Sequence, residues 1–171
     1  MTKQGILLLA IVFAFCLNAT AQSHISAREM LKSMTEKYEE KDGVDGFVFT
    51  KGSGLEFVKL ALRREMGKEF IKGVNMIIII DYSKANTQLV EQIRSQVETL
   101  SQDYEQQELP DSITKGVYLR NFSKMGENNE YISDMVILTE KDDVKTVIYF
   151  GGKIVGEPKS KSKSKSKSKS K

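Results

Sequence analysis

The feature that most constrains this fold is a run of four consecutive isoleucines at 77–80, inside the apolar segment 74–81. Successive side chains of a β-strand point to opposite faces, so a strand of this composition presents branched apolar groups on both faces. Such a strand has to be covered on both sides. The run therefore predicts an interior strand of a sheet that carries helices.

Hydrophobic periodicity predicts the elements around this strand. Apolar residues recur at three- and four-residue spacing over 27–38, 55–66 and 85–104, which indicates helices. Branched and aromatic residues separated by turn-forming segments predict strands, the last three of which form an antiparallel meander. These four further strands are expected at 44–50, 116–122, 131–139 and 144–150.

Three serines have positions that indicate helix starts. Ser26 is followed three residues later by Glu29, and Ser53 by Glu56, which is the spacing of a capping box. Ser83 precedes the third helix and is a candidate N-cap. The order of elements is thus α-β-α-β-α-β-β-β. We predict an α+β fold with one five-stranded mixed sheet and helices packed on it, in which a right-handed crossover joins parallel strands at 44–50 and 74–81.

The N-terminal residues predict export. Lys3 precedes an apolar run at 6–17, and Ala19-Thr20-Ala21 has the small residues of a cleavage site, so residues 1–21 are predicted to be a signal peptide. A membrane-spanning helix needs about 20 residues, so no transmembrane segment is expected in the processed chain. The predicted location is periplasmic or secreted.

Composition divides the rest into two parts. Residues 22–157 are of a length that suits a single α+β domain, whereas 158–171 is almost entirely a Lys-Ser alternation that cannot bury apolar surface and is predicted to be disordered. The only cysteine, Cys16, belongs to the predicted signal peptide, so no disulfide or cysteine nucleophile is expected after cleavage.

The charge of the chain is unevenly placed. Residues 22–157 contain 18 basic and 23 acidic residues, so the folded part is acidic. The tail could make weak electrostatic contacts with anionic surfaces such as lipid phosphates; alternatively it only keeps the chain soluble. Specific nucleic-acid binding is not expected, because no aromatic residues interleave with the lysines. The candidate contacts are Lys159, Lys161, Lys163, Lys165, Lys167, Lys169 and Lys171.

One position is a candidate ligand site. Asp81, Tyr82 and Ser83 follow the most apolar strand, and open α/β sheets bind ligands beyond the carboxyl ends of their strands. The alternative is that Asp81 forms a turn into the next helix. His24 is the only histidine, so neither a Ser-His-Asp triad nor a histidine-rich zinc site is expected, and we predict no metal and no cofactor.

Several segments taken together resemble a known family. They are Glu36-Lys37-Tyr38, Gly43-Val44, the strand 74–81, the helix 89–104 and Val147-Ile148-Tyr149-Phe150-Gly151-Gly152-Lys153-Ile154. Over about residues 25–155 the chain is similar to the small bacterial exported proteins catalogued as domain of unknown function 4252. The resemblance implies an α+β fold in the envelope of a Gram-negative bacterium or outside the cell. It implies no activity and no functional residues.

Two classes of function follow. The favoured one is a non-enzymatic module that binds an envelope protein or a surface, through an exposed apolar patch or an unpaired sheet edge such as the last strand, 144–150. The other is a small enzyme or small-molecule carrier with its site near Asp81 and Tyr82, which requires a pocket there.

Overall fold

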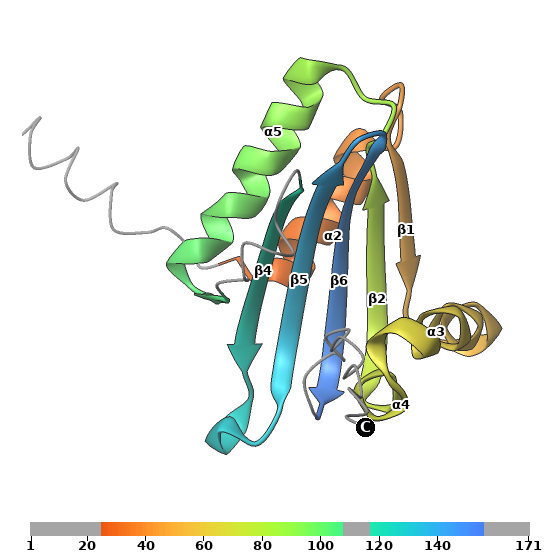
Figure 1. Cartoon of the computed structure of the whole chain (residues 1–171), viewed down its shortest axis with the longest axis vertical. Helices are drawn as coiled ribbons and strands as arrows, with labels where there is room; N and C mark the ends of the chain where they lie inside the picture. Colours follow the sequence, from red (N-terminus) through yellow and green to blue (C-terminus); the bar gives the residue numbers. More distant parts are fainter. Residues whose placement is uncertain (1–24, 108–116, 156–171) are drawn as a thin grey trace, which may run out of the picture.

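The computed structural model describes residues 25–107 and 117–155 (Figure 1). The predicted signal peptide and the Lys-Ser tail lie outside these residues. The described helices and strands are α2 (Ala27–Tyr38), β1 (Asp45–Phe49), α3 (Gly52–Met66), α4 (Lys68–Lys72), β2 (Val74–Asp81), α5 (Thr87–Glu98), η1 (Thr99–Gln102), β3 (Glu105–Gln106), β4 (Tyr118–Met125), η2 (Glu127–Asn129), β5 (Ile132–Lys141) and β6 (Val144–Ile154).

The fold is α+β, as predicted, but the predicted sheet was wrong in two respects. The described strands form one six-stranded sheet in the order β1-β2-β6-β5-β4-β3, and every neighbouring pair is antiparallel. The sheet is therefore neither five-stranded nor mixed. The additional strand, β3, contributes only Glu105 and Gln106, opposite Ser123 and Phe122. Two residues are too few to produce a sequence period, so the pattern could not reveal β3.

The antiparallel pairing of β1 with β2 replaces the predicted parallel crossover. The connection contains two helices, because Gly67, at φ +91°, ends α3 and allows α4 to begin at the next residue. Both helices lie at one end of the sheet, so β2 starts at the end where β1 stops (Figure 1). A parallel pair would need the connection to travel back along the whole sheet.

The larger core lies between α2, α5 and one face of the sheet. From β2 it receives Met76, Ile78 and Ile80, which alternate with residues on the opposite face. Helix α2 contributes Leu31 and Met34, both fully buried. Ser26 caps this helix by accepting a hydrogen bond from the Glu29 backbone N–H at 3.3 Å, as the sequence predicted.

A smaller core lies on the opposite face, under α3 and α4. Phe70 and Ile71 of α4 pack with Ile77 of β2 and Phe150 of β6. Here the predicted cap was wrong: α3 begins at Gly52, before Ser53, without a side-chain cap. Ile77, Ile78 and Ile80 are buried and Ile79 is half-buried, so the isoleucine strand is an interior strand, covered on one face and partly covered on the other.

Candidate functional site

The three residues of the predicted ligand site, Asp81, Tyr82 and Ser83, are consecutive at the end of β2, but their side chains bind different partners. Asp81 accepts a hydrogen bond from the Ser83 backbone N–H at 2.9 Å, which forms the turn that the sequence offered as an alternative. The Ser83 hydroxyl accepts from the Lys145 backbone N–H at 3.0 Å, and the N-cap of α5 is Asn86 instead of Ser83. Tyr82 is fully buried and points into the larger core. The chain therefore uses these polar groups to fix the loop between β2 and α5.

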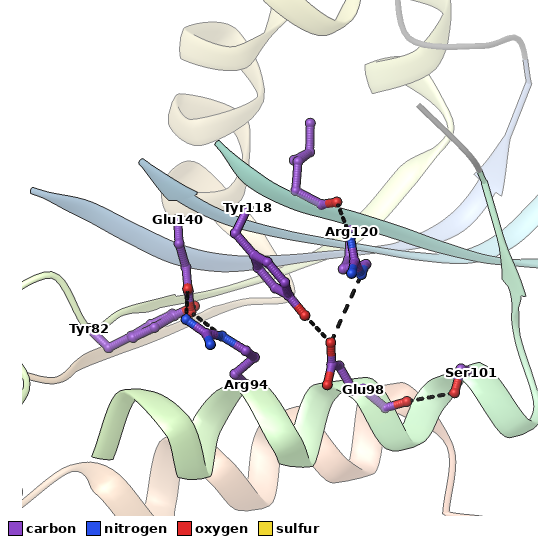
Figure 2. A network of polar contacts seen from close by, with 8 residues as sticks. Tyr82, Arg94, Glu98, Ser101, Tyr118, Arg120 and Glu140 are labelled. Carbon is purple, nitrogen blue, oxygen red and sulfur yellow. Dashed lines mark hydrogen bonds and ion pairs between the residues drawn. The ribbon is translucent and has the colours of Figure 1, made fainter. Parts of the chain in front are cut away.

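The Tyr82 hydroxyl leads to a partly buried ion pair that sequence reasoning missed. It donates to the Glu140 carboxylate at 2.9 Å, and the same carboxylate accepts from Nε of Arg94 at 3.3 Å and from the Arg94 Nη2 (Figure 2). Glu140 comes from β5 and Arg94 from α5, so the pair joins the helix to the sheet. In the sequence, Glu140 stands beside Asp142 and Asp143 at a polar turn, which gives no sign of an ion pair with a helix.

A second layer of this network surrounds Tyr118 of β4. The guanidinium carbons of Arg94 and Arg120 lie 4.6 Å and 4.5 Å from the centre of its ring, which is cation–π geometry. Its hydroxyl donates to Glu98 of α5, and Nε of Arg120 lies 3.9 Å from the same carboxylate (Figure 2). The Tyr118 ring thus contacts two arginines, and each of them also pairs with a glutamate: Arg94 with Glu140 and Arg120 with Glu98.

The protonation chemistry of this network favours a structural role. Burial raises the pKa of Tyr82, and the Glu140 charge and hydrogen bond raise it further, so the phenol stays protonated as a donor. The hydrogen bond to Glu140 raises the pKa of Arg94, which stays charged. Because Glu140 already accepts from both residues, the network offers neither an activated nucleophile nor a proton acceptor waiting for substrate.

A second tyrosine–carboxylate pair lies at the other end of the same core. Tyr149 donates to Asp134 at 2.6 Å, and the Ser133 hydroxyl donates to the other Asp134 oxygen at 2.7 Å. Burial first, and then the bond to Asp134, raises the pKa of Tyr149. Burial likewise raises the pKa of Tyr104, whose hydroxyl accepts from the Ala27 backbone N–H at 3.0 Å. The Asp134 contacts lie within β5 and β6, and the Tyr104 contact joins the start of α2 to the segment that follows η1.

The smaller core leaves part of its face uncovered. Four residues on adjacent strands stand opposite one another in register: Phe47, Ile79, Ile148 and Ile137. Phe47 is 49% exposed and the other three are half-buried, whereas Ile77, Phe150 and Met135 in the neighbouring row nearer α4 are buried. We call these four residues the open apolar row. The isoleucine run does show that β2 has apolar side chains on both faces, but the sequence prediction was that both faces are fully covered.

The open apolar row ends at β1, which is an edge strand among the described residues. Phe47 and Phe49 stack on this edge with ring centres 6.4 Å apart, and Val48 on the opposite face is also exposed. The strand pairs with β2 over five residues without a register shift and contains no lysine or proline, so it lacks features that usually protect an edge. The last strand, β6, was the predicted free edge, but it lies between β2 and β5.

Comparison with known proteins identifies no relative. No family model matches the chain, no curated protein matches it, and no solved structure matches it. The resemblance to domain of unknown function 4252 therefore stays a prediction. Within 25–107 and 117–155, no helix is long and apolar enough to cross a membrane, and no three metal-ligating side chains are grouped so that they could hold an ion.

Proposed function

We propose that this chain is an exported, non-enzymatic module that binds a protein partner along β1 and the open apolar row. The observation that carries the proposal is a regular apolar edge strand beside a half-covered sheet face. The partner that fits is an extended segment with alternating apolar side chains. Its backbone would pair with β1, and every second side chain would lie beside Phe47 and Phe49.

The periplasmic or secreted location and the contact of the Lys-Ser tail with anionic surfaces are part of the same proposal. They rest on the sequence: the leader at 1–21 and the seven lysines from 159 onward. In this arrangement the edge strand provides specificity, and the tail adds an attraction that salt weakens.

A small-molecule site at Asp81 and Tyr82 is the alternative function. Its main difficulty is that the Asp81 carboxylate bonds to Ser83 and the Tyr82 hydroxyl bonds to Glu140. A ligand would have to displace contacts that fix the loop and α5. The edge strand needs no such rearrangement.

The test is an affinity pull-down from native envelope extracts at low and moderate salt. The bait is the processed protein with the tail, without it, with Phe47→Lys or with Met125→Lys. Both substituted side chains are exposed, but Met125 ends β4, far from β1 in the sheet order. We expect one defined protein that is retained without the tail, lost with Phe47→Lys and kept with Met125→Lys, and that then binds the bait directly when purified. Retention only with the tail and only at low salt would contradict the proposal.

A further inference from the structure

The helices α3 and α4 form a second surface, whose lining contains no residue of β1. Between them lies a cleft of about 440 Å³. Its lining residues recur every three or four residues along α3, so they share one face of that helix, and the others come from the short helix α4. The lining residues are Glu56, Lys59, Leu60 and Arg63 from α3, and Lys68, Ile71 and Lys72 from α4. Four of the seven are basic, and Ile71 provides a buried apolar floor.

Lys59 is directed into this cleft by its position on the helix. Its side chain is only 15% exposed, and its ammonium group lies 3.2 Å from the carboxylate of Glu56, one turn earlier. Glu56 itself is largely exposed, so water weakens this pair. The cleft therefore has more positive charge than its own acid neutralises.

Two large apolar side chains stand on the solvent side of α3, next to these cations. Phe57 is 74% exposed and Leu60 is 66% exposed, and their spacing of three residues places them on the same side of the helix. Arg64 is exposed as well. A helix with exposed aromatic and aliphatic groups between basic residues is typical of helices that lie in a membrane interface.

The charge of this segment differs from that of the rest of the domain. Residues 52–72 contain five basic and three acidic residues, whereas residues 22–157 as a whole contain 18 and 23. The end of β6 lies against the same region, since Lys153 donates its backbone N–H to the Gly73 carbonyl at 3.0 Å (Figure 1). The seven lysines of the tail follow in sequence from this point. The α3–α4 segment is thus a basic part of an otherwise acidic domain.

We infer that the α3–α4 surface docks on an anionic lipid bilayer. Phe57 and Leu60 enter the boundary between headgroups and acyl chains. Arg63, Lys68 and Lys72 lie at the level of the lipid phosphates, and the cleft with Lys59 receives one headgroup phosphate. Because the residues assigned to lipid contact are not those assigned to the protein partner, substitutions can test the two interactions separately.

The absence of tryptophan from the chain allows a direct test. Phe57→Trp places a single fluorophore on the surface, and Val144→Trp places one at an exposed apolar position on the β5–β6 hairpin. The processed protein, tail included, is mixed with vesicles of phosphatidylcholine alone or of phosphatidylcholine with phosphatidylglycerol. We expect a blue shift of the emission for Trp at 57 only with the anionic vesicles, and no shift for Trp at 144.

Charge and apolar variants distinguish lipid binding by the α3–α4 surface from lipid binding by the tail. Every variant retains the tail, so a loss of binding is due to the surface. Arg63→Glu with Lys72→Glu is expected to reduce co-sedimentation with the anionic vesicles by about tenfold or more, because each basic residue near the surface adds to the attraction. Lys84→Glu with Lys141→Glu changes the net charge equally at exposed positions elsewhere and is expected to have a small effect.

The apolar pair has its own control. Phe57→Ser with Leu60→Ser is expected to weaken vesicle binding at both low and high salt, whereas Ile25→Ser with Val144→Ser, at comparably exposed positions, is expected to leave it unchanged. Equal binding of all variants, without a blue shift at 57, would assign the lipid contact to the tail and overturn the inference. Absence of binding to anionic vesicles would overturn it as well.

Discussion

Replacing Arg94 by methionine tests whether its partly buried ion pair with Glu140 fixes α5 to the sheet. The substitution keeps much of the apolar stem but leaves the Glu140 side chain, which is 7% exposed, with the Tyr82 hydroxyl as the one donor that we identify for it. Removing one partner of a buried pair costs about 3–5 kcal/mol. Because the Arg94 side chain is 35% exposed, water already screens the pair, and we expect a smaller loss of about 2 kcal/mol in the free energy of unfolding.

A double-mutant cycle with Glu140→Gln measures the coupling. Glutamine keeps the size of the side chain and removes its charge. For this variant alone we expect the free energy of unfolding to fall by about 1 kcal/mol, because its hydrogen bonds are weakened. In the double variant no buried charge is left unpaired. It should therefore be more stable than Arg94→Met by about 1 kcal/mol, as measured by urea unfolding with far-UV circular dichroism.

The exposed residue Lys84 provides the control, since Lys84→Met should change stability by less than about 0.5 kcal/mol. Strict additivity of Arg94→Met and Glu140→Gln would show that the two side chains are not coupled. The fold would then have to hold α5 through apolar packing alone, and the reasoning on the network would be refuted.

Three further outcomes are expected. Tyr82 and Tyr149 have pKa values raised above the ordinary 10.0, so their contribution to the free energy of unfolding is complete below pH 10. Above pH 10 the free energy of unfolding should fall by about 1.4 kcal/mol per pH unit per tyrosine. In a variant with phenylalanine at both positions, urea midpoints should therefore decline less steeply with pH. Gly73→Ala should prevent or strongly destabilise folding, because its Cβ would lie 1.8 Å from the Lys153 carbonyl oxygen, whereas Gly52→Ala meets no atom and should cost only about 1–2 kcal/mol of backbone strain in thermal unfolding. Ile80→Val, in the fully buried row of β2, should cost about 1 kcal/mol, and a loss below about 0.3 kcal/mol would contradict tight packing there.

Local patterns predicted most of the helices and strands because the relevant forces act between near neighbours. The segment 74–81 is the strand β2 with the predicted bounds, and Ser26 caps α2 as its spacing with Glu29 indicated. The break at Gly67 was less apparent. A glycine after an amphipathic stretch predicts a helix end, but it does not predict that a second short helix will begin at once.

The sequence by itself determined that this chain forms an α+β domain around an isoleucine strand, because burial of apolar side chains at a period of two or 3.6 residues is a local property. Only the tertiary structure decided the direction of β1 against β2, the pairing of Arg94 with Glu140, and the exposure of Phe47 and Phe57. These depend on which elements pack against each other across long separations in the chain. A hydrophobic residue looks the same in the sequence whether its face is covered by a helix or left open for a partner.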